Sequence, residues 1–191
     1  MTVTFEDRLN QILPRITHED FLSGRGLGNE IAFFIFDYPA EDELRMRQHV
    51  TFLLDHIPKH KPHLRLAHVN LFDFVIDHLR ERKLLEKTLE LQRTKGGDFV
   101  LRNLEKILHP EKLAPLFAER VSPNEKDLVL VSGVGSVWPL MRTHSLLSNL
   151  HPVMGKTPLV MFYPGKYDGQ SLRLFGKIKT DSYYRAFRLI P

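Results

Sequence analysis

The sequence predicts an α/β fold: a mostly parallel central sheet of about five strands, flanked by helices. Short apolar segments alternate along the chain with longer segments whose apolar residues recur at helical spacing. The short segments are apolar at almost every position, as expected for strands that helices cover on both faces. Parallel neighbours need a crossover connection, and the intervening segments are long enough to supply one. The pattern is typical of a Rossmann-like or a degenerate P-loop-like sheet.

Several segments have the composition of buried strands. The strongest is DLVLVSG, at residues 127–133, and IAFFIFDY ends at Tyr38-Pro39, where proline stops the strand. The predicted strands are residues 31–38, 64–71, 127–133 and 158–165, with a hairpin arm at 172–176 and a last segment at 186–190.

The segments between the strands have helical periodicity. The predicted helices are residues 4–16, a helix from about Glu41 to Ile57 after Pro39, a helix from Leu71 to about Leu91 that breaks near Arg82, two short helices around His109-Pro110 within 98–121, and a helix capped by Ser136, with Pro139 in its first turn, that reaches about Leu150. The helices between the second and third strands are too many for one crossover. We therefore expect a single α/β domain over residues 1–191, in which residues 72–121 form a helical insert or lid.

The composition excludes several classes of protein. The 191-residue chain has no cysteine and a formal net charge of +4, so it has no disulfides or thiolate metal sites and fits a reducing cytoplasm. The first residues lack the pattern of a secretion signal, and no apolar run approaches the roughly 20 residues that span a bilayer. We expect a cytoplasmic protein that does not enter a membrane.

Basic residues gather in the C-terminal third of the chain. Against two acidic residues, Asp168 and Asp181, this part carries Arg142, Lys156, Lys166, Arg173, Lys177, Lys179, Arg185 and Arg188. Two interpretations stay open, since charge runs usually form a solvated face but can also attract an anionic partner such as DNA.

The glycine-rich segments do not have the placement of a nucleotide site. Gly24, Gly26 and Gly28 precede a strand, whereas a dinucleotide-binding turn follows one, so tight turning into the strand is their expected role. Arg25, between two of them, is a candidate contact for an anion or a partner. Residues 133–136 follow a strand, and a phosphate at the next helix start stays an alternative.

Catalytic and metal-binding patterns are also weak. His56, His60 and His63 are separated by lysine and proline, which favours a solvated loop over a metal site. Neither a carboxylate pair nor a nucleophile elbow is evident. We expect no cofactor, no metal and no enzymatic activity.

Three segments together resemble a known family: FLSGRGLGNEIAFFIFDYPAEDE, then SGVGSVWPLMRTHSLLSNLHPVMGKTPLVMFYPGKYDGQSLRLFG, then YYRAFRLIP. They resemble the BrxB family of the bacteriophage exclusion (BREX) defence systems over essentially the whole chain. The resemblance implies a bacterial cytoplasmic component of an antiphage system. It further implies a small core subunit without an assigned activity that binds other BREX proteins, the phosphatase-like PglZ first, with the BrxC ATPase and the adenine methyltransferase as further candidates.

The resulting hypothesis is a non-catalytic adaptor subunit. Its contact surface is expected in polar and aromatic loops at the carboxyl ends of strands, where α/β sheets place their sites. The candidate partner-binding residues are Arg25, Tyr38, Trp138, Arg142, His144, Tyr163, Lys166, Tyr167 and Gln170. The alternatives are a DNA-binding subunit of the same system, with weak or indirect contact to DNA, and a degenerate nucleotide-binding protein.

Overall fold

The computed structural model describes residues 4–24, 32–179 and 186–190. Its helices are α1 (Phe5–Ile16), α2 (Glu19–Leu22), α3 (Glu43–His60), α4 (Leu71–Glu81), α5 (Leu85–Lys95), α6 (Gly97–Leu104), α7 (Pro110–Val121), α8 (Val134–Val137) and α9 (Thr143–Met154), with short 3-10 turns η1 (Ala40–Asp42) and η2 (Pro123–Glu125). Its strands are β1 (Phe33–Tyr38), β2 (Leu66–Asn70), β3 (Leu128–Ser132), β4 (Leu159–Tyr167), β5 (Leu172–Leu174), β6 (Ile178–Lys179) and β7 (Phe187–Arg188).

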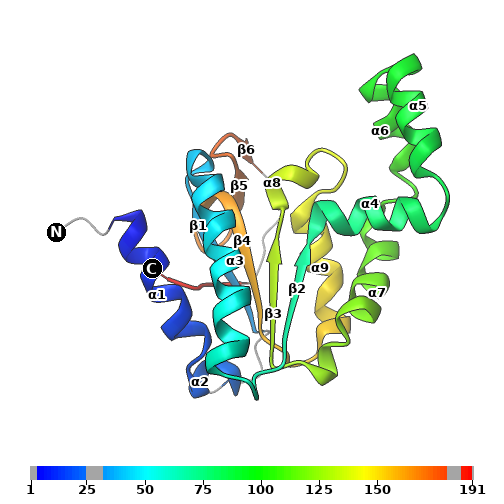
Figure 1. Ribbon diagram of the computed structural model, residues 1–191. Coiled ribbons are helices and arrows are strands. Elements are labelled where there is room, and N and C mark those ends of the chain that lie inside the picture. The colour runs from blue at the N-terminus through cyan, green and yellow to red at the C-terminus, as the bar shows by residue number, and fades with distance from the viewer. Residues whose placement is uncertain (1–3, 25–31, 180–185, 191) are drawn as a thin grey trace.

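The sheet is mostly parallel, which confirms the predicted fold class. Parallel strands follow the order β2-β3-β4-β1-β7, and β1 pairs with β4 from Phe33 opposite Leu159 to Tyr38 opposite Pro164 (Figure 1). β5 pairs antiparallel with the end of β4, and β6 with β5. This order differs from the 3-2-1-4-5-6 order of the dinucleotide-binding folds.

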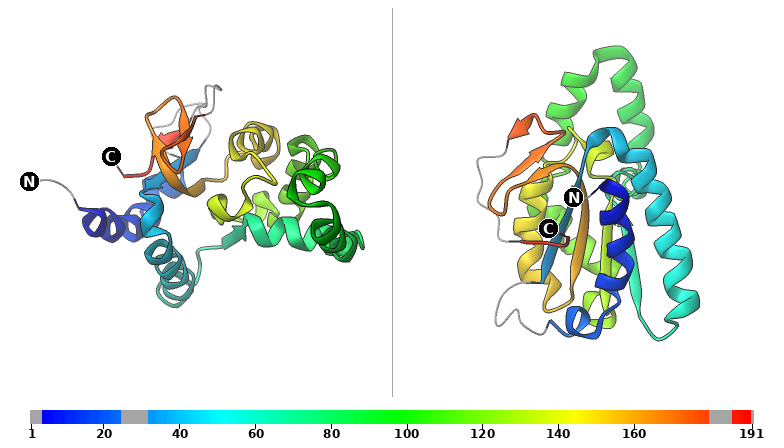
Figure 2. Two further views of the ribbon diagram at one scale, coloured as in Figure 1. Left: turned by 90° about the horizontal axis from the view of Figure 1, so that it is seen from above. Right: turned by 90° about the vertical axis from the view of Figure 1, so that its left-hand side faces the viewer.

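Helices cover both faces of the sheet (Figure 2). Successive side chains of a strand point to opposite faces, so Phe34 and Phe36 pack with residues of α1, α2 and α3. Phe33 and Ile35 lie in the other cluster, with residues of α4, α7 and α9. Each strand is therefore buried on both sides, which explains the apolar runs in the sequence.

The helical segment between β2 and β3 has two parts. α4 and α7 contribute to the core, with Phe74 and Phe117 in an edge-to-face contact at 5.9 Å between ring centroids. α5 and α6 extend away from the sheet as a pair (Figure 1); α5 contributes no buried residue, whereas α6 contributes Val100 and Leu104 to the core. The predicted break near Arg82 falls between α4 and α5, where Lys83 has a φ of 56°.

One helix prediction is wrong. Ser136 does not cap a helix that reaches Leu150, because α8 ends at Val137 and α9 begins only at Thr143. Trp138 is extended, with φ −67° and ψ 137°, since the ring of Pro139 disfavours a helical residue before it. The long helices α1, α3, α4 and α7 agree with the predicted segments.

Among the residues placed by the structure, no helix has the length and apolar character of a membrane span.

Arg8 ties the first helix to the sheet and to the end of the chain. Its guanidinium donates to the carboxylate of Asp37 at 2.8 Å, to the carbonyl of Asp37 and to that of Ile190. Asp37 also accepts the backbone N–H of Tyr167 at 3.0 Å. Both side chains of the ion pair are largely buried, at 18% and 14% exposure, so α1, β1, β4 and the last residues meet at one buried charge pair.

Candidate functional site

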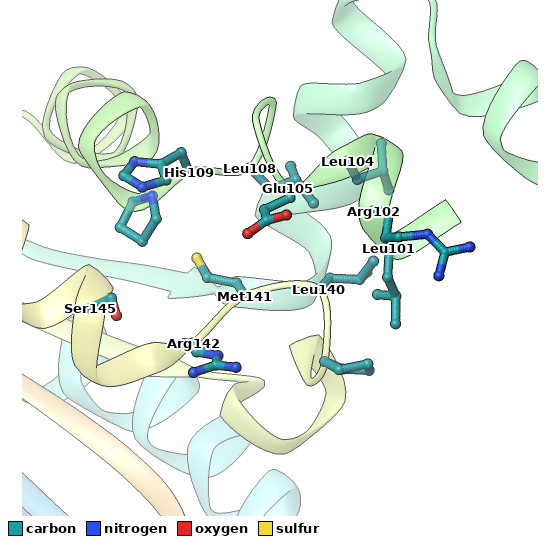
Figure 3. A pocket seen from close by; sticks show the side chains of 12 residues that line it. Leu101, Arg102, Leu104, Glu105, Leu108, His109, Leu140, Met141, Arg142 and Ser145 are labelled. Carbon is teal, nitrogen blue, oxygen red and sulfur yellow. The ribbon is translucent and has the colours of Figure 1, made fainter. Parts of the chain in front are cut away.

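An open groove of about 480 Å³ lies between the α6–α7 segment and the loop that joins α8 to α9 (Figure 3). One wall is formed by Leu101, Arg102, Leu104, Glu105, Leu108, His109 and Pro110. The other is formed by Pro139, Leu140, Met141, Arg142 and Ser145. This site is called the groove below.

Both walls follow from the local sequence. In α6 and the turn after it, Leu101, Leu104 and Leu108 recur at helical spacing, and Leu104 and Leu108 are buried in the core. In the opposite wall Pro139 ends the helical stretch, and Met141 anchors the loop in the same core. The pairing of α7 with α9 then holds the two walls side by side.

The groove carries unneutralised positive charge at its edges. Arg102 and Arg142 are exposed, and neither side chain forms a hydrogen bond or an ion pair with the described residues. Glu105 lies on the same wall as Arg102. Apolar side chains flanked by free guanidinium groups suit a segment with apolar anchors and nearby carboxylates.

The predicted contact residues near the groove have different roles. Arg142 lines it, whereas Trp138 is partly buried and packs against the core. His144 is half-buried in the first turn of α9, and its pKa is lowered by burial and by the charge of Arg142.

The three tyrosines predicted as contacts are buried. Tyr38 donates its hydroxyl to Glu43 at 2.6 Å, and burial raises the pKa of Tyr38. Tyr167 is 1% exposed and its hydroxyl donates to the carbonyls of Gly169 and Ala186. Tyr163 is buried on the face opposite Tyr38. In this structure their side chains build the core and its hydrogen bonds.

The remaining predicted residues lie apart from the groove. Lys166 and Gln170 are exposed on β4 and on the turn that follows it. Arg25 falls outside the described residues. The predicted residues that the structure describes are therefore dispersed, and of these only Arg142 lines the groove.

The sequence does not indicate the α6–α7 wall. It predicts a helical insert there, and the apolar spacing of Leu101, Leu104 and Leu108 indicates only a buried helix face. Arg102 lies between these leucines, and only the structure shows that its side chain has no ion-pair partner among the described residues.

A second, smaller cleft of about 210 Å³ lies under α3 at the carboxyl ends of β2 and β3. His68 Nε2 and Ser132 Oγ lie 2.8 Å apart in it and share a hydrogen bond. Burial lowers the pKa of His68, so a neutral imidazole faces the hydroxyl. Within the described part of the chain, no acidic side chain hydrogen-bonds to the other ring nitrogen, so these residues do not assemble a serine-hydrolase triad.

The glycine turn after β3 is closed by packing. Gly133 has a φ of 73°, and a Cβ there would lie 2.1 Å from Oδ1 of Asn70. A Cβ on Gly135 would lie 3.0 Å from Phe175 and from Pro164. α8 has four residues, so the turn offers no extended helix start for a phosphate. No cluster of metal-ligating side chains is found among the placed residues.

Stability is expected to fall as the pH drops from about 7 to about 5. Among the described residues, burial lowers the pKa of His49, His68, His78, His144 and His151. An unfolded histidine titrates near pH 6.5, so below that pH the unfolded state binds more protons than the folded state. The stability that these neutral histidines contribute is therefore fully present above about pH 6.5 and is lost progressively as the pH falls below it.

Thermal unfolding at a series of pH values measures this dependence. The variant His68→Gln keeps a side chain that can reach Ser132 and should reduce the slope between about pH 7 and pH 5. The exposed His63→Gln serves as the control and should leave the slope unchanged. An equal slope in His68→Gln would refute the role of burial at this histidine.

The fold and the groove define a class: an α/β protein with helices on both faces of a parallel sheet and an open apolar and cationic groove. A family model described as "BREX protein BrxB" matches residues 67–189. A BREX protein BrxB of Bacillus cereus (strain H3081.97) is 41% identical over 188 residues, 96% of each chain. One of Escherichia coli O9:H4 (strain HS) is 44% identical over 187 residues, 97% of this chain and 92% of the relative.

The chain belongs to the BrxB family of BREX phage-defence systems. This confirms the resemblance seen in the sequence, and membership implies other BREX subunits as its setting. No solved structure gives a significant match to the chain.

Proposed function

We propose that the protein is a non-catalytic adaptor subunit of a BREX complex that binds other BREX proteins, PglZ first and the BrxC ATPase or the methyltransferase next. The groove is the main observation that supports this proposal. It combines apolar side chains on both walls with two arginines that form no ion pair with a described residue, and arginine is enriched where interfaces derive most of their binding energy.

The construction of the groove supports a protein ligand. Its two walls come from segments about thirty residues apart that are held by the packing of α7 on α9, so the groove is preformed. A preformed site lowers the ordering cost of binding. The occupant we expect is a partner segment with apolar side chains that fill the space between Leu101 and Leu140 and carboxylates that reach Arg102 and Arg142.

Co-purification tests the proposal. Tagged protein is isolated from cells that express the whole BREX gene cluster, and the bound subunits are identified. The affinity of the protein for each purified subunit is then measured. Arg142→Glu and Arg102→Glu, one on each wall, should each weaken binding about 30-fold, as for the loss of a residue worth about 2 kcal/mol. Both side chains are exposed, so folding should be unchanged.

The matched control is Arg93→Glu on α5, which makes the same charge change at an exposed residue outside the groove lining. It should leave the affinity within about twofold. Equal weakening by all three variants would assign the effect to net charge. Stable binding that none of them alters would reject the groove as the contact surface. Tyr167 is unsuitable as a probe because its side chain is part of the core.

A further inference from the structure

The antiparallel end of the sheet carries an unusual row of positive charge. This hairpin sheet consists of residues 165–167, 172–174 and 178–179. Its register places Lys166 directly opposite Arg173 and Arg173 directly opposite Lys179. Residues opposite one another in an antiparallel pair share a face, so Lys166 and Arg173 lie side by side, and the row below means these two residues with Lys177 in the adjoining turn.

This row lies on the outer face of the hairpin sheet. Leu172 and Leu174, which flank Arg173, are buried in the core, and Tyr167 next to Lys166 is buried as well. Lys166 and Arg173 are exposed, and so is Lys177 in the adjoining turn. Like charges placed directly opposite each other destabilise a sheet, so this arrangement costs folding stability.

The acidic side chains that the structure describes do not neutralise the row. Among the described residues, Lys166, Arg173 and Lys177 form no ion pair. Asp168 is the acidic side chain in the turn, and its carboxylate accepts bonds from the backbone of Gln170 and from Ser171. These bonds, chiefly those from Ser171, lower the pKa of Asp168, with a smaller contribution from the charge of Arg173.

We propose that the outer face of the hairpin sheet binds the phosphate backbone of double-stranded DNA. A row of cations that forms no ion pair with a described carboxylate is complementary to a row of phosphates, and binding them releases counterions. The row consists of lysine and arginine side chains, so the contact positions the protein on DNA without reading its sequence. A membrane surface is less suitable, because the exposed large apolar side chains of the described residues, Leu44, Phe52, Phe72 and Leu89, all lie on other elements.

The hairpin sheet is separate from the groove. None of Lys166, Arg173 and Lys177 lines the groove, so DNA binding and subunit binding rest on different residues. The adaptor proposal can fail while this one holds, and the reverse is also true.

The test uses Arg173→Glu in the full-length protein. This change turns the like-charge pair with Lys166 into an opposite-charge pair, so the thermal midpoint should rise. If the row binds DNA, the same variant should bind a labelled duplex of mixed sequence at least about tenfold more weakly at low salt. The slope of log affinity against log salt concentration should also fall in magnitude by about 1.

The matched control is Lys156→Glu, which makes the same change in net charge at an exposed residue just before the amino end of β4, whereas the hairpin sheet lies at the carboxyl end of β4. It should keep the affinity within about twofold and the slope unchanged. If Arg173→Glu raises the thermal midpoint but leaves the DNA affinity unaltered, the row is only a solvated basic face and the proposal is overturned. Equal losses of DNA affinity in Arg173→Glu and Lys156→Glu would overturn it as well. So would an Arg173→Glu variant that binds phosphatidylserine vesicles or an acidic protein more weakly but binds DNA as before.

Discussion

Replacing Asp37 with alanine is expected to lower the free energy of unfolding by about 3–5 kcal/mol. The substitution leaves the guanidinium of Arg8 largely buried without a carboxylate, and it removes the acceptor of the Tyr167 N–H. An uncompensated buried charge is much more costly than the loss of an exposed ion pair. Denaturant unfolding gives this value directly, and the thermal midpoint should fall by at least about 6 °C.

An exposed ion pair provides the comparison. Arg80 and Asp77 lie 2.5 Å apart on α4 with exposures of 62% and 39%. The variant Arg80→Ala should cost less than about 1 kcal/mol because solvent screens this pair. A similar cost for both variants would show that burial does not set the strength of the Arg8–Asp37 pair.

Replacing Gly165 with alanine is expected to cost about 3 kcal/mol. A Cβ at this position would lie 2.2 Å from the carbonyl oxygen of Arg173 and 3.0 Å from the backbone nitrogen of Phe175. Both are backbone atoms, so rotation of a side chain cannot relieve the clash. We expect β5 to separate from β4, which exposes Leu172 and Leu174, and hydrogen exchange should show faster exchange across residues 165–176.

Gly97→Ala is the matched control at the start of α6. A Cβ at Gly97 meets only the flexible end of Gln92, at 3.6 Å. Alanine is favoured over glycine in a helix, so this variant should be neutral or more stable by less than about 1 kcal/mol. If Gly165→Ala behaved like Gly97→Ala, the close approach of β4 and β5 would be refuted.

The sequence predicts most of the fold because its patterns are local. Apolar runs such as residues 127–133 identify buried strands, and acidic residues after Pro39 identify the start of α3. The wrong prediction of a helix start at Ser136 also has a local cause, because Ser136 favours a helix start whereas Pro139 affects the residue before it. Pro139 suits a first helical turn, but it also disfavours a helical Trp138, and the second effect decides the structure.

The candidate site was less predictable because it depends on contacts between distant segments. Arg142 could be selected as a polar residue in a loop after a strand, but its opposite wall comes from α6. Nothing in the sequence near Arg102 indicates that Arg142 lies across from it. The tyrosines show the converse problem, because an aromatic residue at a strand end suits an interface as well as a core.

The position of β1 between β4 and β7 has a consequence for protein synthesis. Its neighbours are β4, more than one hundred residues later, and β7, at residues 187–188. A ribosome must therefore translate most of the chain before the apolar residues of β1 find either partner, and until then they stay open to chaperones and to aggregation.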